Sequence, residues 1–204
     1  MFLPDDAYRT VSGAGEAEIE VKGSRFIAHA FPVSSVQRAE EEIEAVRRRY
    51  HDATHNCFAY RIGTGPDLVY RFDDAGEPGG TAGRPILQAI EGKGLTDVVV
   101  VVTRYFGGTK LGAGGLVRAY SSAASAALDA AKPVIRYIES AVRVIFPYAF
   151  YNPVQQTLNQ LEGRVVHSAF GEKVSLVIAV RSSRVEQLLS ALRDATSGKL
   201  EVIE

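Results

Sequence analysis

The chain has 204 residues, with 23 lysines and arginines against 24 aspartates and glutamates, so its formal net charge is −1. This balance argues against a strongly basic module that binds nucleic acid over its whole surface. The single cysteine, Cys57, excludes an intrachain disulfide and a zinc site built from several cysteines. The N-terminus lacks the features of a signal peptide, and no apolar run approaches the roughly 20 residues of a membrane helix. We therefore expect a cytoplasmic protein.

The first half of the chain alternates short strand patterns with helix patterns. Residues 16–21 alternate glutamate with apolar residues, which predicts a strand with one wet face, and residues 25–33 keep a strand-like composition. Residues 34–50 carry apolar side chains at spacings of three and four, which predicts an amphipathic helix. Ser34 and Gln37 have the spacing of a capping box at its start. The further elements expected are strands at 54–62, 68–72 and 98–102, helices at 84–91 and 116–131, and a short strand ending at Ile138.

Residues 73–120 hold eleven of the 19 glycines, mainly in two runs at 76–83 and 107–115. Each run precedes a predicted helix, and between them lie five consecutive valines, 98–102, which predict a strand buried on both faces. Free N–H groups at helix N-termini favour anions. We therefore expect the two glycine loops to converge on one surface that binds a phosphate-bearing partner.

Beyond Glu139 glycine becomes scarce and the pattern becomes β-α-β-β-α-β, which is typical of a ferredoxin-like domain. Asn152 and Pro153 are expected to cap and open the first of its two helices. The chain is therefore divided into a glycine-rich domain, 1–138, and a ferredoxin-like domain, 139–204. The elements expected in the second domain are strands at 141–146, 164–170, 173–181 and 200–203, and helices at 152–161 and 183–195.

Three stretches of the first domain resemble the motifs of the IMPACT family, in particular its bacterial YigZ-like branch: THNCFAYRIG, DDAGEPGGTAGRPIL and VVVVVTRYFGGTKLGAGGLVRAY. The resemblance implies an α/β (α+β) fold in two parts. The first part would be similar to the second domain of a small-subunit ribosomal protein. The second would be similar to a C-terminal domain of elongation factor G.

The same resemblance bears on function. Eukaryotic IMPACT members restrain a stress kinase by means of an additional N-terminal domain, which this sequence is expected to lack, so that role does not carry over. The implied role is a non-catalytic binding module linked to translation regulation, with RNA, the ribosome or a translation factor as partner. No membrane partner and no DNA-specific signal is expected.

The candidate ligand-binding residues combine glycines, cations and an aromatic, which suits phosphate contact and base stacking. Packing is the favoured reading for Phe106, and a buried core position for Cys57, rather than a nucleophile paired with His55. The candidates are His55, Asp74, Glu77, Gly79, Gly80, Thr81, Arg84, Arg104, Tyr105, Gly107, Gly108, Lys110, Gly114 and Gly115.

Two alternatives stay open. The first is an enzyme that acts on a phosphorylated or nucleotide-like substrate, using Asp74, Glu77 and His55 with Arg104 and Lys110. The second is a protein-interaction scaffold, which needs no converging polar groups. No catalytic residue and no cofactor is assigned. Magnesium is considered at the acidic cluster, where turn chemistry is favoured for Asp73, while Asp74 and Glu77 remain open between turn and metal ligand.

Overall fold

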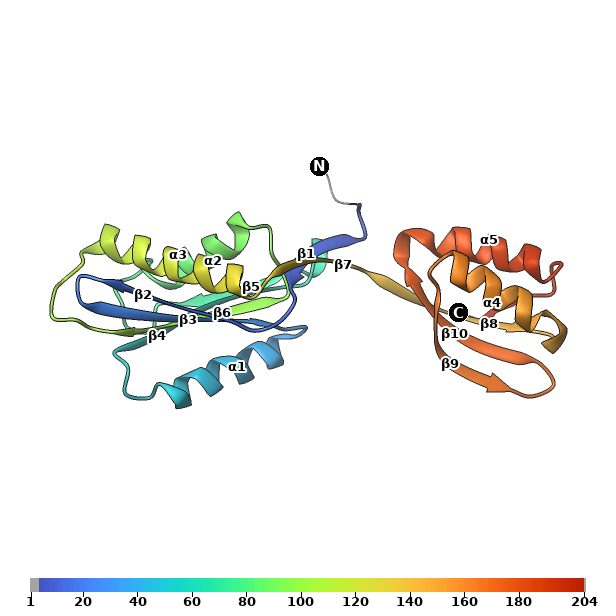
Figure 1. Cartoon of the computed structure of the whole chain (residues 1–204), viewed down its shortest axis with the longest axis horizontal. Coiled ribbons are helices and arrows are strands. Elements are labelled where there is room, and N and C mark those ends of the chain that lie inside the picture. Colours follow the sequence, from blue (N-terminus) through green and yellow to red (C-terminus); the bar gives the residue numbers. More distant parts are fainter. Residues whose placement is uncertain (1–3, 204) are drawn as a thin grey trace. The chain divides into compact units, whose positions relative to one another are not determined.

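The computed structural model describes residues 4–203, which fall into two compact units (Figure 1). One unit comprises residues 8–136, and the other comprises residues 137–203 together with 4–7. Residues 4–7 thus belong to the second unit, not to the 8–136 unit. The reason is hydrogen bonding to residues distant in the sequence. The N–H of Ile138 donates to the Asp6 carbonyl, and Ser183 donates from its N–H and hydroxyl to the Asp6 carboxylate.

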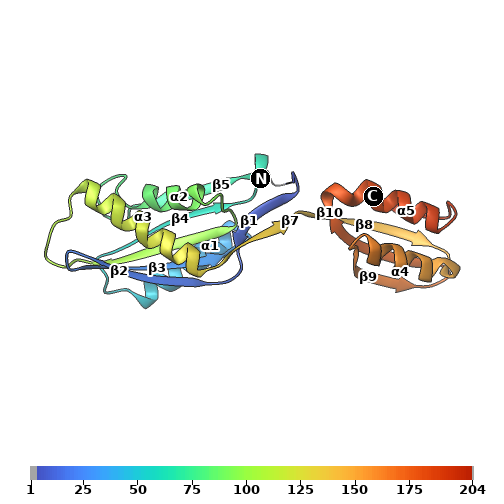
Figure 2. The same ribbon diagram turned by 45° about the horizontal axis from the view of Figure 1, so that its top comes forward.

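The 8–136 unit is built on a five-stranded antiparallel sheet of order β2-β3-β6-β4-β5. Helix α1 covers one face of this sheet, and α2 and α3 cover the other (Figures 1 and 2). The bounds are β2 (Gly15–Val21), β3 (Ser24–Pro32), α1 (Val36–Arg49), β4 (His55–Ile62), β5 (Val69–Asp73), α2 (Gly83–Gly92), β6 (Val98–Tyr105) and α3 (Ala113–Ala130).

Strand β6 is the central strand of this sheet, and all five of its valines are fully buried. Val98, Val100 and Val102 pack with residues of α2 and α3, whereas Val99 and Val101 pack with residues of α1. The prediction of a strand buried on both faces is confirmed, because successive side chains of a strand point to opposite faces.

The N-cap of helix α1 lies one residue later than predicted. Ser35 is the N-cap, and its hydroxyl accepts a hydrogen bond from the N–H of Arg38 at 3.2 Å. The capping box expected from Ser34 and Gln37 is therefore wrong. The side chain of Gln37 instead donates to Glu41, one turn further along the helix.

Two strands that pair with each other form a separate small sheet, β1 (Ala7–Val11) and β7 (Pro133–Tyr137). Strand β7 matches the short strand expected before residue 138. Strand β1 was not predicted, because its five residues, AYRTV, show no clear alternation of polar and apolar side chains. Within the described residues, 4–203, no helix is long and apolar enough to cross a membrane.

The second unit has the ferredoxin-like β-α-β-β-α-β order with a four-stranded antiparallel sheet, β11-β8-β10-β9. Its helix α4 begins at Tyr151, so Asn152 is not its cap and Pro153 is its third residue, contrary to prediction. The bounds are β8 (Glu139–Phe146), α4 (Tyr151–Gln160), β9 (Arg164–Phe170), β10 (Val174–Arg181), α5 (Val185–Ala195) and β11 (Glu201–Ile203). Short 3-10 helices lie at Tyr148–Phe150 and Ser182–Arg184 in this unit and at Gly65–Asp67 in the 8–136 unit.

A fragment of residues 137–204 is expected to fold alone, because the buried cluster between its helices and sheet is drawn entirely from its own elements. It lacks the contacts of Asp6 with Ser183, so its stability is expected to be lower than that of the same unit in the whole chain. An amide NMR spectrum with dispersed signals is the expected result. Poorly dispersed amide signals from the fragment, with well-dispersed signals from the whole chain, would contradict independent folding.

Candidate functional site

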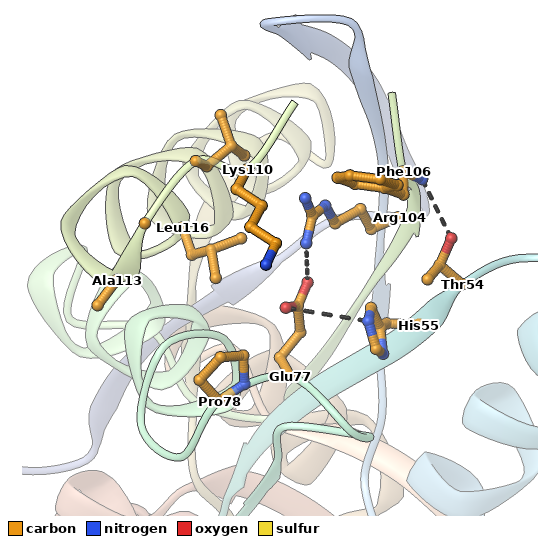
Figure 3. A pocket seen from close by; sticks show the side chains of 11 residues that line it. Thr54, His55, Glu77, Pro78, Arg104, Phe106, Lys110, Ala113 and Leu116 are labelled. Carbon is orange, nitrogen blue, oxygen red and sulfur yellow. Dashed lines mark hydrogen bonds and ion pairs between the residues drawn. The ribbon is translucent and has the colours of Figure 1, made fainter. Parts of the chain in front are cut away.

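A pocket of about 450 Å³ lies where the start of β4, the end of β6 and the two glycine-rich loops meet (Figure 3). His55 and Arg104 are direct cross-strand partners in the register of β4 and β6. Glu77 comes from the loop after β5, and Lys110 from the loop before α3. The other lining residues are Thr54, Pro78, Phe106, Leu111, Gly112, Ala113 and Leu116. Four of the predicted site residues thus share one pocket.

The floor of the pocket is a buried ion pair between Arg104 and Glu77, with 2.6 Å between Nη1 and Oε1. The two side chains are only 6% and 3% exposed. The guanidinium also donates to the Ser24 hydroxyl and lies 5.5 Å from the ring centres of Phe26 and Phe106. Because Glu77 neutralises it, Arg104 is not the open phosphate-binding cation that the sequence suggested. Its Nε has no hydrogen-bond partner among the described residues.

A chain of buried groups supports Glu77 from behind. The Tyr120 hydroxyl donates to the same Glu77 oxygen at 2.8 Å, and the Cys57 thiol lies 3.4 Å from that hydroxyl and 3.0 Å from the Asp74 carbonyl. Burial raises the pKa of the Cys57 thiol to about 12, and burial also raises the pKa of Tyr120. Cys57 is therefore a protonated core thiol at neutral pH, which agrees with the prediction that it is buried and is not a nucleophile.

His55 presents one nitrogen to the pocket. Its Nδ1 lies 2.9 Å from the carbonyl oxygen of Ala75, and a carbonyl can only accept, so Nδ1 carries the proton. In the neutral ring Nε2 then keeps its lone pair, and this atom lies 3.9 Å from Oε2 of Glu77. Figure 3 shows His55 and Glu77 side by side at one end of the pocket.

The first glycine loop folds around Asp74. Its carboxylate accepts hydrogen bonds from the N–H groups of Gly80 at 2.7 Å, Ala82 at 3.0 Å and Gly83 at 2.8 Å. It thereby caps the start of α2, so these N–H groups are not open to an anion, contrary to expectation. The Asp74 carboxylate therefore occupies the position in the loop that an anionic ligand would take.

The acidic cluster has the turn geometry that the sequence favoured for Asp73, whose carboxylate accepts from the N–H of Ala75 at 2.6 Å. The Asp74 carboxylate is occupied by backbone N–H groups, and Glu77 is paired with Arg104. Across residues 4–203, no group of three or more histidines, cysteines or acidic residues is arranged to hold a metal ion.

The second glycine loop leaves a helix start open. Gly112 is the N-cap of α3 with φ of 71°, a left-handed conformation that favours glycine, and it offers no side-chain cap. Among the described residues, the N–H groups of Ala113, Gly114 and Gly115 have no hydrogen-bond partner. Lys110 is exposed beside this helix start, and Figure 3 shows its side chain extending over the pocket.

Comparison with known proteins decides the family. Residues 22–128 match the family described as the Impact N-terminal domain, and residues 144–199 match a domain of unknown function, DUF1949. The IMPACT family member YvyE of Bacillus subtilis is 36% identical over 97% of this chain and 91% of its own length. The chain belongs to the IMPACT family.

Other IMPACT relatives agree with this assignment. A member from Thermus thermophilus is 43% identical over 89% of this chain and 98% of its own length. YigZ of Escherichia coli is 32% identical over 90% of this chain and 91% of its own. A crystal structure described as a hypothetical protein has a TM-score of 0.70 with 30% identity and covers 98% of both chains. The α+β fold with two units is thus shared with a solved structure.

Several predicted residues of this IMPACT chain lie outside the pocket lining. The Tyr105 hydroxyl donates to Asp52 at 2.7 Å, and the Thr81 hydroxyl donates to the Pro78 carbonyl at 2.6 Å. Gly115 lines a smaller cavity of about 180 Å³, which shares Leu111 with the pocket. The others outside the lining are Asp74, Gly79, Gly80, Arg84, Gly107, Gly108 and Gly114.

Sequence reasoning missed the apolar wall of the pocket and Thr54. The hydroxyl of Thr54 accepts from the N–H of Phe106 at 3.1 Å, which ties the β4 start to the second loop. Leu111 and Leu116 flank the glycines of that loop, and this isolated apolar pair was the available signal. The ring of Phe106 packs on the Arg104 guanidinium, as the packing interpretation predicts, but 48% of the residue is exposed at the rim.

Proposed function

We propose that this pocket binds single-stranded RNA, and that the chain is a cytoplasmic, non-catalytic module that contacts RNA or the ribosome. The observation that carries the proposal is the open first turn of α3 beside Lys110, in the same pocket as the exposed ring of Phe106. Unpaired N–H groups and the positive end of a helix dipole favour a phosphate, and an exposed aromatic ring favours a base.

The charge of the pocket supports an anionic ligand. Arg104 and Lys110 contribute two positive charges and Glu77 one negative charge, which leaves a net charge of +1 when His55 is neutral. Arg104 is already paired with Glu77. The attraction for an anionic ligand therefore comes from Lys110 and from the N-terminus of α3. A near-neutral chain must draw its affinity for RNA from such a local patch, and this affinity weakens with salt.

The size of the pocket supports a ligand of about one nucleotide. Its volume, about 450 Å³, lies in the range of about 300–1,000 Å³ that is usual for small-molecule sites. Phe106 stands at the rim with one ring face toward Arg104 and nearly half of its surface exposed. Stacking of a base on such a ring tolerates any sequence.

An enzyme acting on a nucleotide-like substrate is the second candidate. The orientation of His55 favours this candidate. The Ala75 carbonyl holds Nδ1, so Nε2 faces the pocket and could accept a proton from a substrate as a general base. Turnover of a ribonucleotide, lost in His55→Ala, would favour this candidate over the binding module.

Replacing Lys110 with alanine is expected to weaken RNA binding several-fold at about 0.1 M salt and to reduce the slope of log affinity against log salt by about 0.7. Lys110 is exposed, so the fold should be unaffected. Binding of a short labelled RNA, measured by fluorescence anisotropy over a salt series, checks both effects. The matched control is Arg48→Ala on α1, which removes an exposed cation from the opposite side of the sheet. Equal binding by Lys110→Ala and the parent at every salt concentration would sink the proposal.

A further inference from the structure

Two hydrogen-bond acceptors stand next to each other at one end of the pocket and lack donors. Oε1 of Glu77 is already engaged by Arg104 at 2.6 Å and by Tyr120 at 2.8 Å. Its second oxygen, Oε2, faces Nε2 of His55 at 3.9 Å, which is too long for a direct hydrogen bond. Among residues 4–203 neither atom has a donor within hydrogen-bond distance. Both atoms keep contact with solvent in the pocket, because neither is among the buried side-chain atoms without a partner in residues 4–203. A ligand that brings a donor can therefore replace water at both acceptors.

We propose that His55 and Glu77 read the exocyclic amino group of a nucleobase, so that the pocket prefers cytosine, adenine or guanine over uracil. This inference rests on the proposed function, because it names the part of the RNA that enters the pocket. Glu77 repels a phosphate from this end, whereas Lys110 and the α3 start attract one nearby. The pocket therefore has a donor-seeking end and an anion-seeking end.

An amino group fits the pair better than a hydroxyl does. With Nδ1 of His55 donating to Ala75, Nε2 in the neutral ring is an acceptor, so both facing atoms require a proton. A hydroxyl carries one proton, whereas an exocyclic amine carries two on one nitrogen.

The separation of the two acceptors also suits one bridging nitrogen. A nitrogen about 2.9 Å from both atoms would see them about 85° apart, given their 3.9 Å separation. The two N–H bonds of an amine diverge by about 120°, so each hydrogen bond would be bent by only about 20°. Uracil places a carbonyl oxygen where cytosine has its amine, and that oxygen would face two further acceptors.

The test compares oligocytidine and oligouridine RNA of equal length, bound to the full chain at about pH 7.5. These ligands share their backbone and differ chiefly in the amine or carbonyl on the ring. Oligocytidine is expected to bind at least about tenfold more tightly, since a well-placed pair of hydrogen bonds discriminates bases by that order. His55→Ala should lower this ratio several-fold, while Arg48→Ala, on the other face of the sheet, should leave it unchanged.

A second measurement needs no variant. The ring nitrogen signals of His55, followed by NMR, should show Nε2 shifting on saturation with oligocytidine and hardly at all with oligouridine.

The other outcomes would contradict the amino-group inference, and one of them would also contradict the proposed RNA binding. Equal binding of the two RNAs by the parent overturns the amino-group inference and leaves the proposed RNA function in place. A cytidine preference that persists in folded His55→Ala, or an unmoved Nε2 signal, also overturns the inference. Failure of both RNAs to bind overturns the proposed function and the inference with it.

Discussion

Replacing Arg104 with alanine is expected to lower the free energy of unfolding of the 8–136 unit by about 3–5 kcal/mol. The change leaves the Glu77 carboxylate, which is 3% exposed, without its 2.6 Å partner. It also removes the guanidinium from between the rings of Phe26 and Phe106. An unpaired buried charge costs far more than a lost surface contact, so this change should be among the most damaging in the unit.

Denaturant unfolding of the whole chain measures this effect. Arg84→Ala is the matched control, because Arg84 is exposed on α2 and its loss should change stability by no more than about 0.5 kcal/mol. Similar unfolding curves for the two variants would contradict the buried ion pair. The same reasoning makes Arg104 a poor test of ligand binding, since its replacement perturbs the fold.

Replacing Gly107 with alanine is expected to cost about 3 kcal/mol, because the second loop packs directly on the β2–β3 turn. A Cβ at Gly107 would lie 1.9 Å from the carbonyl carbon of Gly23, 2.0 Å from its oxygen and 2.3 Å from the nitrogen of Ser24. All three atoms belong to the backbone, so no side chain can move aside. The loop after β6 would have to move away from the β2–β3 turn, which would also disturb the edge of the pocket.

The control for Gly107→Ala is Gly79→Ala in the first loop. A Cβ at Gly79 meets no atom within 4 Å, and Gly79 does not have a positive φ. The thermal midpoint should therefore fall by several degrees for Gly107→Ala and stay near the parent value for Gly79→Ala. Equal midpoints would show that the loop is free to move away from Gly23.

Much of the fold follows from local patterns. The valines of β6 and the apolar face of α1 were readable because their periodicity reflects which sides of an element are buried. The caps were less readable. Ser34 and Ser35 are both plausible caps, and only the backbone geometry selects Ser35. Strand β1 depends on its pairing with β7, more than a hundred residues away, so no local signal announces it.

Four of the fourteen predicted site residues line one pocket, but their charge distribution was not predictable. His55, Glu77, Arg104 and Lys110 were all recognised, and they share one pocket. The sequence could not show that Glu77 neutralises Arg104 across 27 positions. Nor could it show that Asp74 accepts from the N–H groups of the first loop. The first contact depends on how the loop after β5 lies against the end of β6, and the second depends on the backbone conformation of that loop.

An amide NMR titration of the full chain with a short single-stranded RNA tests whether the start of α3 and the loop before it form the phosphate-binding part of the pocket. The largest shifts are expected on Lys110 to Leu116, including the unpaired N–H groups of Ala113, Gly114 and Gly115, while α1 on the opposite face stays unchanged. Saturable binding whose shifts fall on α1 or on residues 137–203, with the start of α3 unmoved, would contradict this assignment.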